Sequence, residues 1–291
     1  MAARTAPRVA PLPAIAYEPV VRAALLEDLG LGGDLTSDAT IAGDATVVAS
    51  LVAREAGVLA GLDMARCAFR LLDGCLQFER TKHDGDRVEA AETFALVTGA
   101  ARAVLGAERT VLNLLAHLSG IASMTARYVA AVAGTACAIS ETRKTLPGLR
   151  ALQKYAVRAG GGTNHRLRLD DAILIKDNHV ALAGGIVPAL RAARARAGHL
   201  VKVEIEVDTL AQLEEVLECG MADAVMLDNF TLDSVRAAVR RIAGALVVEV
   251  SGGVALDDVA AIARAGADVI SVGALTHSAR ALDIGLDIVP V

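Results

Sequence analysis

The stretch VKVEIEV (residues 201–207) alternates between apolar and charged residues, which is the period of a β-strand. One face is apolar, and the other carries Lys202, Glu204 and Glu206. Covering helices need the apolar face, so the charged face is predicted to point inward. A sheet with helices on both sides would instead need two apolar faces. The stretch therefore predicts a strand of an α/β barrel with a polar mouth rather than of an open doubly wound sheet.

This strand belongs to a series of short β-rich runs in the second half of the chain. They cover residues 136–141, 172–177, 201–207, 224–228, 246–251 and 268–273. Amphipathic helix patterns follow three of them, at 209–219, 231–243 and 256–265. The last four runs start 22 or 23 residues apart, at 201, 224, 246 and 268, which is the length of one βα unit. Repeated βα units predict a parallel sheet.

The first part of the chain mixes helix and strand patterns. Helices are expected at 17–29 and 62–72, and strands at 47–60, 77–82 and 94–104. Residues 106–133 are apolar on nearly every face and predict a buried helix that is interrupted near Ser119 and Gly120. The tail 282–288 alternates with period 2, which predicts a strand that returns to the first domain.

Composition narrows the class of protein. The chain has 34 Asp and Glu against 29 Lys and Arg and is only 2% aromatic, which argues against nucleic-acid binding. No apolar run approaches the roughly 18 residues of a membrane span. The four cysteines have no metal-ligand spacing and are expected to be reduced thiols of a cytoplasmic protein. The start, MAARTAPRVAPLP, lacks the apolar core of a signal peptide, so we expect a frayed terminus, with an organelle-targeting segment as the alternative.

Polar or glycine-rich groups stand at the carboxyl ends of the predicted strands, where barrel enzymes carry their active sites. They are residues 141–144, 176–179, 206, 228–229, 251–253 and 273–274. Loops after strands are commonly polar, but this explains one or two such groups rather than a full set in register. We therefore predict an active site at this end of the barrel.

An anion site is predicted within this set. Residues 143–168 contain seven Lys and Arg and no Asp or Glu. Arginine forks suit carboxylates and lysines suit phosphates, which selects Arg143, Lys144, His165, Arg166 and Lys176. The helically spaced Arg150, Lys154 and Arg158 are interpreted as a solvated face, and Gly160–Gly162 as a turn.

Two further groups have alternative interpretations. Ser251, Gly252, Gly253 and Gly273 follow the last two strands, where barrels commonly bind phosphate, although glycine pairs also make simple turns. Glu206 and Asp228 are candidates for holding Mg²⁺, for binding sugar hydroxyls or for acid–base catalysis. The alternative is that Lys202 or Lys176 neutralises them.

Several strings, in fixed order, resemble the quinolinate phosphoribosyltransferase family. They are AERTVLNLLAHLSGIA (107–122), ETRKTLPGLR (141–150), GGGTNHR (160–166), KDNH (176–179), EIEVD (204–208), LDNF (227–230), SGG (251–253) and GALTHS (273–278). The resemblance covers essentially the whole chain after the first dozen residues. Two positions depart from the family pattern: Glu141 stands where Asp is frequent, and Arg168 where small or polar residues are common.

The resemblance implies a fold, an assembly and a reaction. The fold is an N-terminal α/β open sandwich over residues 1–115, rejoined by the tail 279–291, and an incomplete α/β (TIM-like) barrel over 116–278. The assembly is a homodimer or a multiple of one, in which Arg109 completes the neighbour's site. The reaction joins quinolinate to phosphoribosyl pyrophosphate with Mg²⁺, and it yields nicotinate mononucleotide, pyrophosphate and CO₂ for NAD biosynthesis.

The resemblance also implies residue roles. The catalytic set is Lys144, Lys176, Glu206 and Asp228. The substrate-binding set is Arg109, Thr142, Arg143, Lys144, His165, Arg166, Lys176, Glu206, Asp228, Ser251, Gly252, Gly253 and Gly273. Mg²⁺ is expected mostly on pyrophosphate and water, with Glu206 and Asp228 as the candidate protein ligands. The remaining alternatives are a phosphoribosyltransferase for a monocarboxylate such as nicotinate, a homologue serving molybdenum metabolism, and a non-catalytic binding protein.

Overall fold

The computed structural model describes residues 9–290, and the chain folds into two compact units. Unit 1 contains the chain up to residue 126, residues 145–161 and the chain from residue 275; unit 2 contains residues 127–144 and 162–274. The domain boundaries expected at residues 115 and 278 stay a prediction. Most of the N-terminal stretch expected to be frayed lies outside the described residues. None of the helices described is long and apolar enough to cross a membrane.

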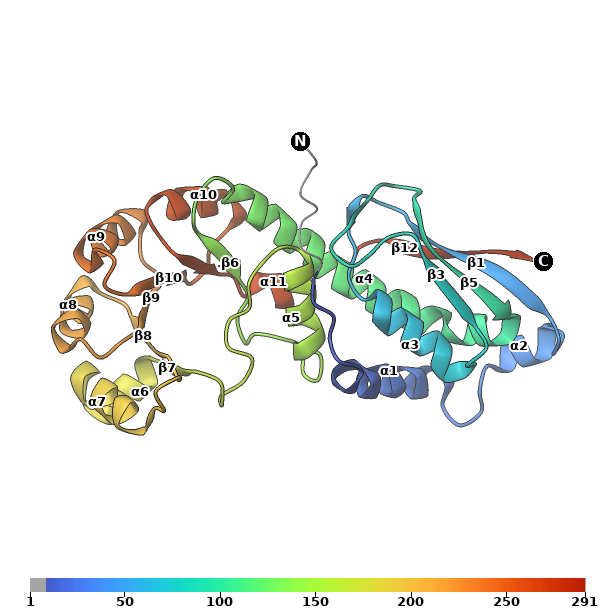
Figure 1. The fold of residues 1–291 in the computed structure, drawn as a ribbon, viewed down its shortest axis with the longest axis horizontal. Helices are drawn as coiled ribbons and strands as arrows, with labels where there is room; N and C mark the ends of the chain where they lie inside the picture. Colours follow the sequence, from blue (N-terminus) through green and yellow to red (C-terminus); the bar gives the residue numbers. More distant parts are fainter. Residues whose placement is uncertain (1–8, 291) are drawn as a thin grey trace. The chain divides into compact units, whose positions relative to one another are not determined.

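Unit 1 is built on a four-stranded antiparallel sheet in the order β12-β1-β5-β3. Its strands are β1 (Thr46–Ala53), β3 (Gln77–Arg80), β5 (Thr93–Ala100) and β12 (Ile284–Pro290). The helices α1 (Ala14–Leu29), α3 (Leu62–Leu72) and α4 (Ala101–Ala131) accompany this sheet (Figure 1). Smaller elements are α2 (Leu35–Thr40), β2 (Gly57–Val58), β4 (Arg87–Val88) and α11 (Ala274–His277). The tail pairs with β1 throughout β12, which confirms the predicted returning strand.

Helix α4 corrects two expectations from the sequence. The strand expected over 94–104 ends with β5 at Ala100, and the helix continues unbroken through Ser119 and Gly120. A Cβ atom at Gly120 would lie 2.1 Å from the carbonyl oxygen of Arg280. The glycine therefore lets the returning chain approach the helix closely and does not break it, a reason that lies more than 150 residues away in the sequence.

Helix α5 (Arg150–Ala159) also differs from the prediction of a solvated basic face. Lys154 is 2% exposed, and Arg150 and Arg158 are half-buried. The fully buried Gln153 explains much of this packing, because its amide donates to His117 Nε2 (2.9 Å) and to the Thr276 carbonyl (3.0 Å). Residues 145–161 are thereby fixed within unit 1.

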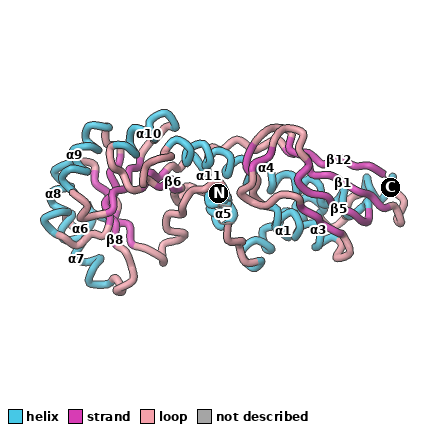
Figure 2. The backbone as a smooth tube through the Cα atoms, turned by 45° about the horizontal axis from the view of Figure 1, so that its top comes forward, coloured by secondary structure: helices cyan, strands magenta, loops and turns pink. Residues whose placement is uncertain are grey.

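Unit 2 is a six-stranded parallel sheet in the order β6-β11-β10-β9-β8-β7. The strands are β6 (Ala138–Ser140), β7 (Ile173–Ile175), β8 (Val203–Val207), β9 (Ala224–Asp228), β10 (Val247–Ser251) and β11 (Val269–Ser271). The helices are α6 (Asp177–Ala183), α7 (Ile186–Arg196), α8 (Leu210–Cys219), α9 (Leu232–Ile242) and α10 (Leu256–Arg264), and they run along the outside of the strands (Figure 2). Within the described residues the sheet ends at β6 and β7, so the barrel is incomplete, as predicted.

The alternation in β8 produces the expected two faces. Val203, Ile205 and Val207 are fully buried, whereas Glu204 and Glu206 are only partly buried. Lys202 does not join them, because it precedes the strand and pairs with Asp223 at 3.2 Å with its side chain 79% exposed. The polar interior of unit 2 is therefore acidic along this strand.

Candidate active site

A cavity of about 380 Å³ lies at the carboxyl ends of the unit 2 strands. Its lining residues are Thr142, Arg143, Lys144, His165, Arg166, Leu174, Lys176, Glu206, Met226, Asp228, Glu249, Ser251 and Gly252. Parallel strands bring these positions together because all their carboxyl ends point the same way. The cavity thus joins ten of the thirteen residues predicted for the site.

The strands determine where each group stands. Thr142–Lys144 follow β6, and Lys176 is the N-cap of α6 directly after β7. Asp228 and Ser251 are paired across the last residues of β9 and β10. Adjacent βα units therefore supply neighbouring groups at one rim.

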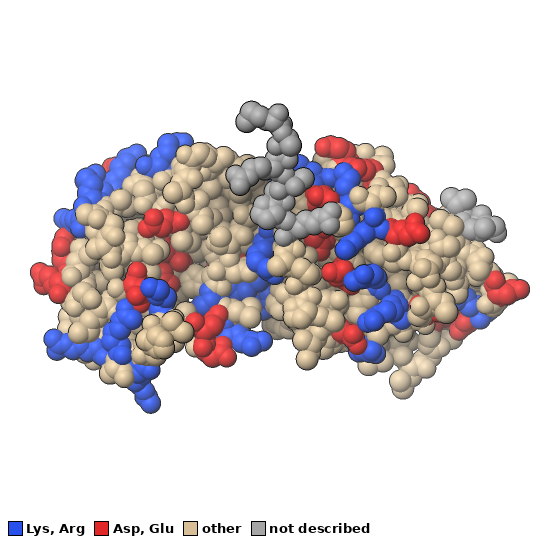
Figure 3. Space-filling model, in the orientation of Figure 1, with Lys and Arg blue, Asp and Glu red and all other residues tan. Residues whose placement is uncertain are grey.

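Two arginines form the basic part of the cavity. The Nε–H groups of Arg143 and Arg166 are buried and have no hydrogen-bond partner among the described residues. Burial, followed by the nearby charge of Arg143, lowers the pKa of the Arg166 guanidinium. Buried donors are almost always paired in proteins, so this pair is suited to an anion with at least two acceptor groups. Outside the cavity, basic and acidic side chains are interspersed over the face shown in Figure 3.

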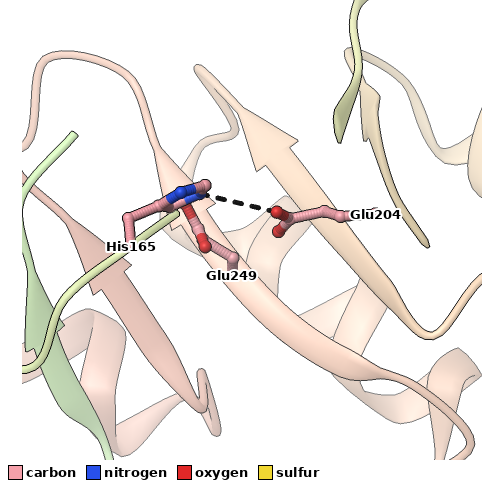
Figure 4. A group of neighbouring side chains, drawn as sticks. All are labelled: His165, Glu204 and Glu249. Carbon is pink, nitrogen blue, oxygen red and sulfur yellow. Dashed lines mark ion pairs between the residues drawn. The ribbon is translucent and has the colours of Figure 1, made fainter. Parts of the chain in front are cut away.

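His165 lies beside two glutamates that sequence reasoning did not assign to the site, the buried Glu249 and the partly buried Glu204 (Figure 4). Its Nε2 is 3.5 Å from Glu204 Oε2 and 3.5 Å from Glu249 Oε1. Burial lowers the pKa of His165, but the two carboxylates outweigh burial and raise it to about 9. The backbone N–H of Arg166 donates to His165 Nδ1 at 2.7 Å, so a second ring proton could be added only by breaking this bond. Burial also raises the pKa of Glu204.

A third glutamate, Glu141, holds the segment that carries His165. It is fully buried, and it accepts hydrogen bonds from Asn164 Nδ2 (3.0 Å) and from the His165 backbone N–H (3.2 Å). Its position directly after β6 was visible in the sequence. Strand alternation likewise put Glu204 on the inner face, but the contacts of Glu204 and Glu249 with His165 depend on the 162–166 loop, which no local pattern describes.

Carboxylates form the opposite part of the site. Glu206 makes an ion pair with Lys176, so the predicted neutralisation by Lys176 is present, whereas Lys202 is paired elsewhere. Oxygen atoms of Glu206, Asp208 and Asp228 lie within 4.8 Å of one another. Three such oxygen donors suit a hard divalent cation, and Asp208 is an addition to the predicted pair.

The glycine segment after β10 has a conformation that requires glycine. Gly252 has a φ of +94°, and a Cβ atom there would lie 2.3 Å from Asn229 Oδ1. Gly253, with φ of +59°, has open space at the same position and lines an adjoining cavity of about 170 Å³. Gly273 lines neither of these cavities.

Arg109 lies in unit 1, on α4, and is exposed. It lines a separate cavity of about 310 Å³ together with Ala24, Glu27, Asp28, Thr110, Asn113, Leu114, His117 and Leu149. Its side chain has no hydrogen bond or ion pair with any residue from 9 to 290. Arg168, which we did not assign to substrate, is exposed and its backbone N–H donates to Asp171.

An incomplete parallel barrel with paired arginines, a carboxylate group and a glycine turn at its mouth defines an α/β enzyme for small, multiply anionic substrates. Residues 34–119 match the quinolinate phosphoribosyl transferase N-terminal domain, and residues 121–287 match the C-terminal domain of the same family. The chain belongs to the quinolinate phosphoribosyl transferase family.

Individual relatives agree with this assignment. The chain is 49% identical to the nicotinate-nucleotide pyrophosphorylase [carboxylating] of Mycobacterium leprae, with 92% of this chain and 95% of that protein covered. It is 40% identical to the crystal structure of NadC from Streptococcus pyogenes, with 97% and 99% covered and a TM-score of 0.93. The nicotinate-nucleotide pyrophosphorylase structure from Ehrlichia chaffeensis gives 38% identity, 94% and 98% coverage and a TM-score of 0.90.

Proposed function

We infer that this chain transfers the phosphoribosyl group of phosphoribosyl pyrophosphate to quinolinate. The products are nicotinate mononucleotide, pyrophosphate and CO₂, and the reaction serves NAD biosynthesis. Two observations support it: the family membership of the chain and the buried, unpartnered Nε–H groups of Arg143 and Arg166. The second observation supports quinolinate as the substrate, because two arginines with unpartnered donors suit its two adjacent carboxylates, whereas nicotinate has only one.

The dicarboxylate clamp consists of Arg143, His165, Arg166 and Lys176. Arg143 and Arg166 are close enough for their charges to interact, which favours a doubly charged partner over a single carboxylate. Lys176 also lines the cavity, where it makes an ion pair with Glu206 and keeps 44% of its side chain exposed for a ligand. Bound in this clamp, quinolinate would present its ring nitrogen toward the carboxylates.

The phosphoribosyl donor occupies the other part of the cavity. Lys144, Glu206 and Asp228 face its ribose and pyrophosphate, and the 5′-phosphate lies on Ser251–Gly253 and Gly273. The left-handed backbone at Gly252 supports this role, since it brings main-chain N–H groups close to a ligand without an intervening side chain. The Thr142 hydroxyl accepts a hydrogen bond from the Lys144 backbone N–H at 3.0 Å, which stabilises the segment after β6 that carries Lys144.

Mg²⁺ fits the carboxylate group of this site. Glu206, Asp208 and Asp228 offer the oxygen donors that the ion prefers. When bound, Mg²⁺ would screen the negative charge of the pyrophosphate.

Positioning and charge account for the chemistry. Departure of pyrophosphate develops positive charge at the anomeric carbon, which Glu206 and Asp228 are placed to stabilise. The quinolinate nitrogen forms the new bond to that carbon and becomes a pyridinium. The positive nitrogen stabilises the electron pair left on the adjacent carbon when the C–CO₂ bond breaks, and a proton then takes the place of CO₂.

We propose that the functional unit is a homodimer or a multiple of one, with Arg109 supplied to the neighbour's site. Arg109 is a cation in a cavity, and its side chain makes no hydrogen bond or ion pair with any of the residues from 9 to 290. A carboxylate bound to a second copy would provide that partner. We also propose a cytoplasmic location, which the unpaired state of Cys67, Cys75, Cys137 and Cys219 supports.

One assay tests the reaction against its alternatives. The protein is incubated with phosphoribosyl pyrophosphate, Mg²⁺ and either quinolinate or nicotinate, while nucleotide and CO₂ are measured. We expect nucleotide and CO₂ in equal amounts from quinolinate and little product from nicotinate. Turnover of nicotinate alone would favour the monocarboxylate enzyme, and turnover of neither would favour a binding protein.

A further inference from the structure

Asn229 stands between the two parts of unit 2 that we assign to the phosphoribosyl donor. It follows Asp228 directly at the end of β9, and its backbone N–H donates to the Ser251 carbonyl at 3.1 Å. The ladder between β9 and β10, whose last pair is Asp228 and Ser251, is thereby extended by one residue. Asn229 therefore lies next to both the carboxylate of Asp228 and the glycine turn after β10, although it lines neither the cavity of about 380 Å³ nor that of about 170 Å³.

The chain turns at Asn229, whose backbone lies in the left-handed region with a φ of +54°. Among residues other than glycine, asparagine and aspartate tolerate this region best. With the chain turned in this way, Nδ2 of Asn229 donates to Oδ2 of Asp228 at 2.7 Å. A hydrogen bond from an amide to a carboxylate is charge-assisted, so it holds the Asp228 carboxylate at one rotation about its Cβ–Cγ bond.

The Asp228 carboxylate belongs to an acidic group, in which such a hydrogen bond matters. Oxygens of Glu206, Asp208 and Asp228 lie within 4.8 Å of one another, and like charges at this distance repel each other. Glu206 is held by its ion pair with Lys176, and Asp228 is held by the Asn229 amide. A carboxylate that is fixed against this repulsion loses less freedom when a sugar hydroxyl or a cation binds to it.

The same side chain also lies against the glycine turn. A Cβ atom at Gly252 would be 2.3 Å from Oδ1 of Asn229 and 2.8 Å from both its Cγ and its backbone nitrogen. Asn229 therefore occupies the space beside Gly252 that the side chain of any other residue would need. The carboxylate proposed for the ribose and the turn proposed for the 5′-phosphate thus share one residue as their support.

We propose that Asn229 is a positioning residue for the phosphoribosyl donor. Its amide orients the Asp228 carboxylate toward the ribose, and its side chain supports the Gly252 turn that receives the 5′-phosphate. Asn229 acts through these two groups and is not itself a catalytic residue. The proposal rests on the proposed function for the identity of the donor.

Two variants that keep the left-handed backbone separate positioning from turn formation alone. Asn229→Gly removes the amide, so it should raise the KM for the phosphoribosyl donor about 10-fold and leave the KM for quinolinate within about two-fold. Asn229→Asp has the same shape and tolerates the same backbone, but it places a second carboxylate beside Asp228 and should raise the donor KM further. A donor KM in Asn229→Asp at or below that of Asn229→Gly would overturn the proposal, as would an equal rise in the KM values for the two substrates.

A double-mutant cycle tests the contact between Asn229 and Asp228. In an Asp228→Ala background the target of the amide is gone, so Asn229→Gly should change kcat/KM for the donor by less than about three-fold. Effects that multiply fully in the double variant would overturn the proposal.

Ala243→Gly is the matched control for the backbone. Ala243 also has a left-handed backbone, with a φ of +47°, but it is exposed at the end of α9. Its replacement should leave the donor KM unchanged, because it touches neither Asp228 nor the glycine turn. Urea unfolding of each variant shows that the compared proteins are folded.

A binding measurement tests the proposal without turnover. Ribose 5-phosphate carries the sugar hydroxyls and the 5′-phosphate without the pyrophosphate, and NMR titration gives its Kd for each protein. We expect Asn229→Gly to weaken this binding about five- to ten-fold and Ala243→Gly to leave it unchanged. If ribose 5-phosphate did not bind to the wild type, or bound equally to Asn229→Gly, the proposal would be overturned. If it binds as expected but quinolinate is not converted, the proposed function fails and the positioning role of Asn229 stands for another sugar phosphate.

Discussion

The two units each contain an arginine cavity, but the cavities differ in how the cations are held. In unit 2, Arg143 and Arg166 have buried donors, and the Arg166 backbone is fixed by a ring resting on glutamates. In unit 1, Arg109 is exposed on a helix and no residue of the described chain binds it. We propose from this difference that unit 2 has a preformed anion site, whereas the arginine of unit 1 receives its partner from a second copy of the chain.

The largest effect is expected from Arg166→Ala. Loss of one of two buried guanidinium groups should lower kcat/KM for quinolinate by on the order of 2–4 kcal/mol. Steady-state kinetics with quinolinate as the varied substrate measure this change, with Arg168→Ala as the control. Near-wild-type kinetics would remove Arg166 from the clamp.

Glu206→Ala should affect the other substrate. The change removes a group for the donor and leaves Lys176 without its ion-pair partner, so kcat/KM for phosphoribosyl pyrophosphate should fall by about 2–3 kcal/mol. Titration of Mg²⁺ should also give a weaker apparent affinity. If the KM for the donor and kcat were both unchanged, the proposed role of Glu206 in binding the phosphoribosyl donor would be wrong.

Arg109→Ala tests the comparison between the units directly. We expect a loss of about 1–3 kcal/mol in kcat/KM for quinolinate. When Arg109→Ala and Arg166→Ala chains are unfolded together and refolded, about a quarter of the wild-type activity should return, because about half of the dimers are mixed and one of their two sites is intact. If mixing restores nothing, Arg109 acts within its own chain or not at all.

A smaller effect is expected at the glycine turn. Gly252→Ala adds a clash with Asn229 to the strain of a left-handed backbone and should cost about 1–3 kcal/mol of stability or donor binding. Gly253→Ala has a left-handed backbone but open space, so it is the matched control. The free energy of unfolding in urea and the KM for the phosphoribosyl donor are measured for both variants. Equal changes in the two variants would show that the clash with Asn229 is unimportant.

The smallest effect concerns Asp84, within unit 1. Burial raises its pKa, although the Tyr155 hydroxyl (2.6 Å) and the Leu62 N–H (3.1 Å) donate to it. A carboxyl group with a raised pKa in the folded state contributes stability that is complete below its ordinary value of 3.8 and is lost as pH rises through the raised value. Asp84→Asn should therefore gain stability relative to wild type between acidic and neutral pH.

Urea unfolding at several pH values measures this difference, with the exposed Asp44→Asn as the control. A difference between wild type and Asp84→Asn that does not change with pH would contradict the assignment.

Much of the fold was predictable because it follows from local periodicity. The six parallel strands were predicted from short β-rich runs, the last four of which have the spacing of βα units, and the return of β12 was predicted from period-2 alternation. The predictions that were wrong concern residues whose environment depends on contacts between segments that are distant in the sequence. The sequence suggests that Gly120 interrupts a helix, because it does not show that the carbonyl of Arg280 packs against this glycine. It also suggests that Lys154 is solvated, whereas the packing of α5 buries this side chain.

The residues of the functional site were likewise predictable where local patterns place them and were missed where distant contacts do. Strand ends gave Thr142–Lys144, Lys176, Glu206 and Asp228, because register alone brings them to one rim. Glu204 was predicted as an inward-facing residue, but its contact with the His165 ring, like that of Glu249, depends on the path of a loop. Asp208 was likewise missed, since it lies just beyond the strand that carries Glu206.

Equilibrium binding of quinolinate and of nicotinate, by calorimetry, tests the preformed dicarboxylate clamp of unit 2 most directly. We predict that the wild-type protein binds quinolinate at least about 10-fold more tightly than nicotinate, and that Arg166→Ala loses most of this preference. Equal affinities in the wild type, or a preference that survives in Arg166→Ala, would contradict the account.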